Sequence, residues 1–301
     1  MDLTTHLRTF TAVVRCGGFS EAARQLGVVP SLVAKRIAQL EHEVQARLFD
    51  RTTRRVALTE AGEKLYARAA TVVAEFEDLL SAVQRDEGKP EGHLRVMAPT
   101  TLTMEQLGPA FCDFLAAHPR ITMEVVLVDR STNPAEGGFD VAISGRAASY
   151  EGVVDVPLCP VRPLLCAAPA FLARQAVPTH PRDLADLDCL VFSATGTTWT
   201  FVSARGTTPV DVRARLLADD NRTLLHAAVK GLGIALLPAY ITAPAFAAGE
   251  LELVLPGYTP QENWFKAHVP RRRMGVTRVK ALLEFLKERV PSMLHVPEAG
   301  S

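Results

Sequence analysis

The first 60 residues carry apolar positions at the spacing of short amphipathic helices. One stripe, with intervals of four, three and four residues, consists of Leu3, Leu7, Phe10 and Val14. It predicts a helix that ends at the glycine pair 17–18. A second short helix follows, with Ser20 as its expected N-cap and Gly27 at its end. A serine hydroxyl accepts the first free amides of a helix, and glycine tolerates the positive φ that stops one.

A third helix is predicted after Ser31, which repeats the capping role. Its inward positions are Leu32, Val33, Ile37 and Leu40, and its outward positions are Lys35, Arg36 and Gln39. Two short helices joined by a tight glycine-containing turn form a helix-turn-helix, whose second helix fits the major groove of DNA. Residues 24–55 hold seven Lys or Arg against three Asp or Glu, a net charge of plus four that suits contacts with phosphates.

Residues 48–59 alternate apolar and polar positions on both sides of residues 52–54, which predicts a small β-hairpin with arginines crowding its tip. In a winged helix-turn-helix such a hairpin lies beside the DNA backbone or minor groove, where guanidinium groups bind phosphate oxygens. The alternative is an unrelated amphipathic helix pair with a solvated charged face. The expected DNA-binding residues are Ser20, Ser31, Leu32, Lys35, Arg36, Gln39, Arg51, Thr53, Arg54 and Arg55.

A long helix is predicted after Thr59, a good N-cap. Its apolar residues step by four, three, four, three and four, which is the seam of a coiled coil sustained for nearly three heptads. A helix of about 25 residues, roughly 38 Å long, exceeds what a 60-residue head can cover, so it is expected to pair with its own copy. The alternative is packing against the C-terminal domain of the same chain. The expected dimerisation residues are Leu65, Val72, Phe76, Leu79 and Val83, with Ala69 also in the seam.

The charged segment 86–92, with two glycines and a proline, is expected to be a linker between domains. Two recognition helices held in a symmetric dimer predict a pseudo-palindromic operator in double-stranded DNA, with half-sites about 34 Å apart.

Strands and helices alternate after residue 93, which predicts α/β layers around a mostly parallel sheet. The expected strands are 93–99, 121–128, 139–144, 162–169, 189–192, 210–217, 233–238 and 263–270, and the expected helices are 104–117, 222–230 and 276–289. Two such lobes leave a cleft that suits a small ligand. Thr100 and Thr101 follow the first strand at a helix start, so their hydroxyls and amides are candidates to bind a carboxylate or another anion; simple helix capping is the alternative.

These motifs resemble the LysR-type transcriptional regulators. The carriers of the resemblance in the N-terminal part are Phe10, "GGFSEAARQLG" at 17–27, "RIAQLE" at 36–41 and "RLFDRTTRRVALTEAG" at 47–62. In the C-terminal part they are "GHLRVMAP", "FDVAI", "LLCAAPAFLA", "DLADLDCLVF" and "AAVKGLGIALLP". The resemblance implies an N-terminal all-α winged helix-turn-helix with a long linker helix, and a C-terminal α/β periplasmic-binding-protein-like (type 2) effector domain of two lobes.

The resemblance also implies the domain limits and further partners. The expected domains are 1–58 (DNA binding), 59–87 (linker and dimerisation helix), 88–92 (hinge) and 93–301 (effector domain), with lobe I at about 93–161 and 266–290 and lobe II at about 162–265. A dimer of dimers is expected, with RNA polymerase as a further candidate partner and an effector of unknown identity. By correspondence, the residues that line or border the cleft are Ser144, Thr197, Trp199, Phe201 and Asp219.

The chain departs from the family pattern at four places. Val29 and Ala34 stand where relatives usually have Ser or Thr, so two hydroxyls that could bond phosphates or base edges are missing. Gln45 replaces a glycine after the third helix and is expected to alter a helix end. Residues 144–146 read Ser-Gly-Arg where related chains more often have Arg-Ile-Gly, which moves a cation by two positions and makes an effector borrowed from relatives unsafe.

Composition adds limits but no chemistry. The formal net charge is zero, with 33 basic and 33 acidic residues, so local charge must decide on DNA binding. No stretch is apolar enough to span a membrane, and residues 1–15 lack the order of a signal peptide, so cytoplasmic localisation is expected. Five scattered cysteines without a C-x-x-C motif favour buried thiols over a metal site. No metal and no cofactor is expected.

Three other functions compete with a regulator. An enzyme is disfavoured because the sequence has no nucleophile elbow, P-loop, dinucleotide turn or zinc helix. A solute-binding protein of a transport system would suit the C-terminal domain, but the DNA-binding head and the lack of an export signal argue against it. A thiol-switch regulator would use Cys159 and Cys166, seven residues apart. The sequence therefore favours a DNA-binding regulator that responds to a small molecule, and not an enzyme.

Overall fold

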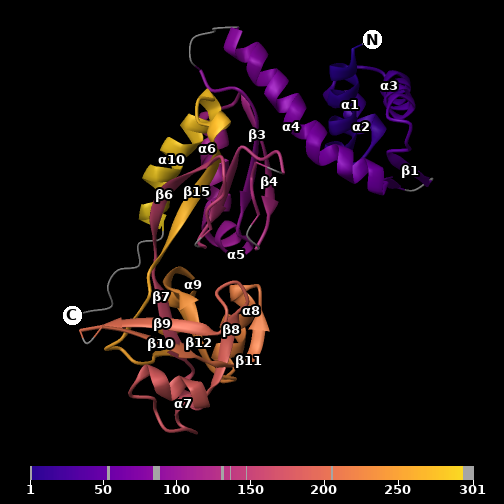
Figure 1. The fold of residues 1–301 in the computed structure, drawn as a ribbon. Coiled ribbons are helices and arrows are strands. Elements are labelled where there is room, and N and C mark those ends of the chain that lie inside the picture. The colour runs from indigo at the N-terminus through magenta and orange to yellow at the C-terminus, as the bar shows by residue number, and fades with distance from the viewer. Residues whose placement is uncertain are drawn as a thin grey trace. The chain divides into compact units, whose positions relative to one another are not determined.

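The computed structural model describes residues 2–52, 55–83, 89–129, 132–135, 137–146, 148–204 and 206–293. The chain divides into two compact units, Met1–Lys89 with Asn133–Phe139 and Pro90–Thr132 with Asp140–Ser301 (Figure 1). Thr53 and Arg54 at the expected hairpin tip lie outside the described residues, and so do residues 86–88 of the expected linker.

The first unit confirms the predicted helical head and hairpin. Its elements are α1 Leu3–Cys16, α2 Phe19–Gln25, α3 Pro30–Glu43, β1 Phe49–Thr52, β2 Arg55–Leu58 and α4 Glu60–Val83. Helix α1 ends at Gly17, whose φ of 67° is left-handed, as glycine allows. Strands β1 and β2 pair antiparallel, with Thr52 opposite Arg55 at the tip end.

Two predicted caps are wrong and one is confirmed. Helices α2 and α3 begin before Ser20 and Ser31, with Gly18 and Val29 at the N-cap and no side-chain cap bond at either helix. The backbone explains the early start of α3, because proline at its first position lacks an N–H and has a helical φ already. Thr59 does cap α4: its Oγ1 accepts the N–H of Gly62 at 3.1 Å.

The turn between α3 and the hairpin is fixed by two residues. Gln45 takes φ 51°, the left-handed conformation in which a helix commonly ends and which glycine adopts most easily. The expected alteration of this helix end by Gln45 stays a prediction. Glu41 is buried, and its Oε1 accepts the N–H of Leu48 at 2.8 Å. A buried carboxylate with backbone donors holds the start of the hairpin against α3.

The core of the first unit contains the first two residues of the seam that was expected to form the dimer. Phe10 is fully buried and meets the Phe49 ring edge-on, with centroids 5.4 Å apart. Leu65 and Ala69 of α4 pack into this same core, whereas Val72 and Phe76 are 50% and 37% exposed. Leu65 therefore serves the head of its own chain, because the first turns of α4 cover α1. The side chains of Leu79 and Val83 lie outside the described set.

Lobe I of the second unit is built on a mixed sheet. Its strands, in the spatial order β4-β3-β5-β15-β6, are β4 Ile121–Leu127, β3 Gly92–Ala98, β5 Val141–Ser144, β15 Asn263–Pro270 and β6 Val153–Val161. Strand β3 is parallel to β4 and β5, but β15 is antiparallel to both β5 and β6. The predicted mostly parallel sheet is thus wrong for half of these ladders.

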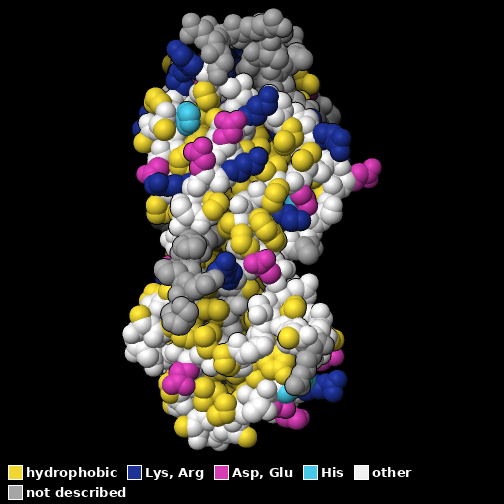
Figure 2. Space-filling view, turned by 90° about the vertical axis from the view of Figure 1, so that its left-hand side faces the viewer, with side chains coloured by type: hydrophobic (Ala, Val, Ile, Leu, Met, Phe, Trp, Pro, Cys, Tyr) yellow, Lys and Arg dark blue, Asp and Glu magenta, His cyan; other side chains and the backbone are white. Residues whose placement is uncertain are grey.

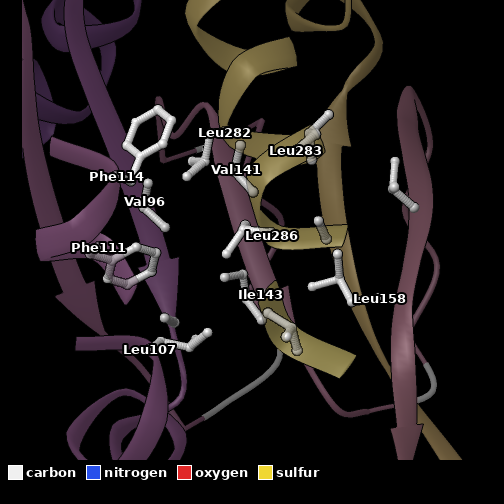
Figure 3. Packing of buried hydrophobic residues seen from close by; sticks show 14 of the residues in the cluster. Val96, Leu107, Phe111, Phe114, Val141, Ile143, Leu158, Leu282, Leu283 and Leu286 are labelled. Carbon is white, nitrogen blue, oxygen red and sulfur yellow. The ribbon is translucent and has the colours of Figure 1, made fainter. Parts of the chain in front are cut away.

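Helices α6 Gly108–Ala117 and α10 Thr277–Met293 cover one face of this sheet (Figure 1). Figure 3 shows Phe111 and Phe114 of α6 and Leu282 and Leu286 of α10 around Val141 and its strand neighbours. Burial of such side chains stabilises by about 1.5–3 kcal/mol each, which makes this face the main stabilising layer of the lobe. The opposite face carries the even-numbered residues of β15, His268 among them, because side chains alternate along a strand.

Lobe II has a second mixed sheet and a small third one. The five-stranded sheet, in the spatial order β11-β8-β12-β7-β13, contains β11 Arg213–Ala218, β8 Asp188–Phe192, β12 Ile234–Pro238, β7 Pro163–Ala167 and β13 Glu252–Leu253. The three-stranded sheet contains β10 Gly206–Asp211, β9 Thr198–Ser203 and β14 Thr259–Pro260. This lobe also contains helices α7 Pro169–Leu172, α8 Asn221–Val229 and α9 Ala239–Ala247 and the 3-10 helix η2 Pro181–Asp186. A further 3-10 helix, η3 Arg271–Arg273, precedes α10.

Two predicted boundaries are corrected. The helix expected at 104–117 begins at residue 100, as α5 Thr100–Leu102 and a π-helical turn η1 Thr103–Leu107 that lead into α6. The strand expected at 210–217 is two strands of different sheets, separated at Val212. Val212 is buried in the core of lobe II and its N–H donates to the carbonyl of Thr197, which turns the chain from one sheet to the other.

Candidate nucleic-acid interface and ligand cleft

Helix α3 separates a buried face from a charged one. Val33, Ile37 and Leu40 are almost fully buried, and Lys35 and Ser31 are exposed. Leu32, Arg36 and Gln39 are half-buried. The exposed surface of α3 thus includes its N-terminal part and the Lys35 side, which is the part of a recognition helix that contacts base edges.

The side chain of Arg36 is oriented by a contact within the DNA-binding head. Its guanidinium reaches Thr9 Oγ1 of α1 at 3.5 Å, so it bridges two helices at the edge of the exposed face. Val29, at the N-cap of α3, is 61% exposed and Ala34 is exposed as well. Since neither side chain can form a hydrogen bond, this face offers apolar contact where relatives offer hydroxyls. Thymine methyl groups are the base feature that such side chains can contact.

Ser20 is exposed on α2, and Arg51 and Arg55 belong to the hairpin strands. Those of the expected residues that the structure describes thus lie on α3, on α2 and on the hairpin strands, and a winged helix-turn-helix uses such elements to contact DNA.

A cavity of about 490 Å³ lies between the two lobes of the second unit, a volume typical of small-molecule sites. Both lobes contribute to its wall, and so does the crossover of the chain between them. From lobe I and the crossover it is lined by Met97, Pro99, Thr101, Leu102, Val128, Asp129, Ser144, Arg146, Tyr150, Val161, Asn263, Phe265 and His268, among others. From lobe II it is lined by Phe192, Thr195, Thr198, Trp199, Thr200, Leu236, Pro238 and Tyr240, among others.

The two threonines expected to bind an anion already bind carboxylates of the chain. The N–H of Thr100 donates to Asp129 Oδ1 at 2.9 Å, and the hydroxyl of Thr101 donates to Asp220 Oδ1 at 2.9 Å. Asp220 also caps α8, since its Oδ2 accepts the N–H of Thr223 at 2.8 Å. Thr101 lines the cavity, whereas Thr100 contributes its amide from the border. An effector anion at this place would have to replace a carboxylate of the protein.

The family-derived residues divide into two groups. Ser144 and Trp199 line the cavity, but Thr197, Phe201 and Asp219 do not. Phe201 is fully buried in the core of lobe II, on the same face of β9 as Trp199. Thr197 and Asp219 are exposed in the turns that flank β9 and α8. Thr197 and Phe201 are neighbours of the wall residues Thr198 and Thr200, so the correspondence did not tell which side chains of this segment face the cavity.

Several polar residues of the cavity wall were not predicted from the sequence, among them Arg146, Tyr150 and His268. Of these three, only Arg146 has a signal in the sequence, as a cation displaced by two positions from the family pattern. Burial lowers the pKa of Arg146, while the charges of Asp129, Tyr150 and Asp219 oppose the shift. Tyr240, also on the wall, has its pKa raised by burial and is a neutral phenol there.

Polar contacts join the lobes beside the cavity. Besides the bond between Thr101 and Asp220, Arg222 Nε of α8 donates to Glu105 Oε1 of η1 at 2.7 Å. These residues are partly exposed, so the pair contributes modestly to stability, but it constrains the angle between the lobes.

The cysteines do not form a candidate redox site in the described structure. Cys159 lies in the core of lobe I and Cys166 in a core of lobe II, so the two thiols of the suggested couple face different interiors. Burial raises the pKa of Cys159 to about 11 and that of Cys166 to about 12. A thiol with so high a pKa is a poor nucleophile, and a structural role explains both residues.

Within the described residues no group of three His, Cys, Asp or Glu side chains is arranged to hold a metal ion, and no helix is both long and apolar enough to cross a membrane. On the face that Figure 2 presents, Lys and Arg side chains are interspersed with Asp and Glu.

A winged helix-turn-helix and a two-lobe α/β domain with a cavity between its lobes define a class of DNA-binding proteins that respond to small molecules. Comparison with known proteins agrees with this. The family model described as "Bacterial regulatory helix-turn-helix protein, lysR family" matches residues 4–63, and the "LysR substrate binding domain" matches residues 87–291. The chain belongs to the LysR family of transcriptional regulators. It is thus a DNA-binding regulator with an effector-binding domain.

Individual relatives span nearly the whole chain. The transcriptional regulator PtxR of Pseudomonas aeruginosa is 30% identical over 287 residues, which are 95% of this chain and 92% of that protein. DmlR of Escherichia coli is 29% identical, with 96% and 94% coverage. Among solved structures, CrgA of Neisseria meningitidis, a LysR-type regulator, is similar with a TM-score of 0.59 and 27% identity, covering 94% of this chain and 97% of CrgA.

Proposed function

We propose that the protein binds a pseudo-palindromic operator as a dimer, through residues 1–58, and that an effector in the cleft between the lobes changes the relative arrangement of the heads. The observation that carries this proposal is the exposed, cationic N-terminal half of α3 next to a hairpin with arginines in each strand. The residues proposed to contact DNA are Ser20, Ser31, Leu32, Lys35, Arg36, Gln39, Arg51, Thr53, Arg54 and Arg55.

Regulation is proposed to work as a population shift. An effector moves the equilibrium between two arrangements only by its difference in affinity for them, typically about 1–3 kcal/mol. Tight binding alone does not change DNA occupancy. The assembly is proposed to reach a dimer of dimers and to act on RNA polymerase, and the place of action is proposed to be the cytoplasm because the target is DNA. No catalytic step is part of this proposal.

We expect Arg54→Ala to weaken binding to operator and to random duplex by a similar factor, because it removes a phosphate contact. The slope of log K against log salt should fall by about one. Titration of labelled duplexes at several salt concentrations measures both effects. Arg15→Ala, an exposed arginine in the last turn of α1, is the matched control and should leave the slope unchanged. Equal slopes for wild type and Arg54→Ala would refute the wing assignment.

We expect Phe76→Glu to yield monomers, because it places a charge in the exposed apolar stripe that Phe76 forms with Val72 on α4. Light scattering of the purified full-length protein measures the mass. Arg68→Glu, at an exposed position of the same helix, is the control and should remain a dimer. If both variants stay dimeric, α4 is not the main interface.

A further inference from the structure

Arg146 extends from lobe I across the cavity. Strand β5 ends at Ser144, whose hydroxyl accepts the N–H of Arg146 at 3.1 Å and so fixes the turn from which the arginine emerges. The guanidinium lies over the ring of Phe192, with its Cζ 5.6 Å from the ring centroid. Phe192 is the last residue of β8 in lobe II. The cation is therefore oriented by both lobes and forms part of the cavity wall.

This cation has no counter-ion among the residues that the structure describes. Asp129 and Asp219 influence its charge, but neither carboxylate lies within ion-pair distance of the guanidinium. Asp129 instead accepts the N–H of Thr100. A partly desolvated guanidinium without a carboxylate partner gains most from an added anion, since charge-assisted bonds to arginine are about twice as strong as neutral ones.

His268 offers a second polar contact on the same wall. It is 1% exposed, and its Nδ1 is 2.8 Å from Asp155 Oδ1. Because a carboxylate accepts, Nδ1 carries the proton of this bond, and Nε2 is the ring nitrogen that remains for another partner. Within the described chain Nε2 is buried without a hydrogen-bond partner. Tyr150 interacts electrostatically with Arg146. Its ring also meets the ring of His268 edge-on, with the centroids 6.0 Å apart. Arg146 and His268 therefore lie in the same region of the cavity wall.

We propose that the effector is an organic monoanion with an apolar, ring-sized body and a hydroxyl or amine group. Its acid group binds Arg146, and its hydroxyl or amine forms a hydrogen bond with His268 Nε2. This inference rests on the proposed function, because it names the ligand class of the same cleft. It differs from the anion site expected at Thr100 and Thr101, whose donors already hold Asp129 and Asp220.

The remaining wall residues support each part of this description. A single negative charge suits the cavity because Asp129 also lines it and would repel a second one. Leu102, Val128, Leu236 and the aromatic rings of Phe192 and Phe265 favour an apolar body. A cationic ligand would be repelled by Arg146, and a neutral amide would not neutralise the charge of its guanidinium.

Calorimetric titration of the full-length protein tests the ligand class. The probes are 4-hydroxybenzoate, 4-hydroxyphenylacetate and benzoate, each with its neutral amide. We expect at least one hydroxylated acid to bind roughly tenfold or more tightly than its amide, and 4-hydroxybenzoate to bind more tightly than benzoate, which lacks the hydroxyl. Arg146→Met should remove the preference for the acid. Arg213→Met, at an exposed arginine paired with Asp188 outside the cavity, is the control and should bind as wild type does.

The opposing outcomes are distinct. If no acid binds, if the amides bind equally well, or if Arg146→Met binds the acids like wild type, the ligand class is wrong. Duplex binding by the same preparations separates this from the proposed function. Retained preference for operator DNA with failed acid binding overturns only the ligand class, whereas loss of that preference in the wild type overturns the proposed function.

Discussion

Replacing Gly62 with alanine is expected to unfold the DNA-binding head at temperatures where the wild type is stable. A Cβ at this position would lie 2.2 Å from the carbonyl oxygen of Leu48 and 2.8 Å from Leu58 Cδ2. In an open helix, glycine to alanine gains about 1 kcal/mol. Here the backbone of Leu48 must move, which weakens the bond it accepts from the N–H of Thr59. We expect a net loss of about 2 kcal/mol or more in the free energy of unfolding of the head.

The positions of the tryptophans allow this loss to be assigned. Both, Trp199 and Trp264, belong to the effector domain, so tryptophan fluorescence reports on that domain, and circular dichroism also reports on the helices of the head. Gly62→Ala should lower the first circular-dichroism transition and abolish operator binding without moving the fluorescence midpoint. Gly18→Ala is the control, since no atom lies within 4 Å of a Cβ there and its φ is extended. An unchanged dichroism curve for Gly62→Ala would refute the steric argument.

Asp140→Ala is expected to lower the fluorescence midpoint instead. Asp140 is 2% exposed, its Oδ2 accepts the N–H of Arg95 at 2.8 Å, and its Oδ1 lies 3.2 Å from Arg273 Nε, which is equally buried. Breaking a buried ion pair by removing one member takes away part of the compensation of the other buried charge and costs about 3–5 kcal/mol. For a domain of this size that corresponds to a shift of roughly 10 °C.

Two controls separate the ion pair from the loss of a side chain. Asp140→Asn keeps an acceptor for the Arg95 amide but not the charge, so it should recover only part of the loss. Asp113→Ala breaks an exposed pair with Arg289 and should change the midpoint by less than about 1 °C. If Asp113→Ala and Asp140→Ala shift the fluorescence midpoint equally, burial of the pair is not the cause.

The head was predictable because its pattern is local. The spacing of Leu3, Leu7, Phe10 and Val14 and the position of Gly17 depend only on neighbours along one helix. The caps Ser20 and Ser31 failed because serine also fits inside the first turn, and the sequence does not say which residue turns first. The seam of α4 was predicted as one stripe, but Leu65 belongs to the head, since the same spacing fits either partner.

The effector domain was predictable in its order of elements but not in its sheets. Strand β6 was missed because Pro157 and Pro160 argue against a strand; they are tolerated because β6 lies at the edge of its sheet. Helix α9 was missed because its residues are apolar on all sides and include Pro244. Arg146 and His268 are more than 100 residues apart in the sequence, and the pairing of β15 with β5 brings His268 near the turn that carries Arg146.

Asp220 belongs to two elements at once, as the cap of α8 in lobe II and as the acceptor for Thr101 in lobe I. A ligand oxygen that took over the Thr101 hydroxyl would leave the helix cap intact and cut a bond between the lobes. A ligand carboxylate that binds the Thr101 hydroxyl would replace the carboxylate of Asp220. This exchange would add little to the affinity of the ligand. The effect of a ligand at such a site would then depend on the angle between the lobes that it permits, and two acids of equal affinity could change DNA binding differently.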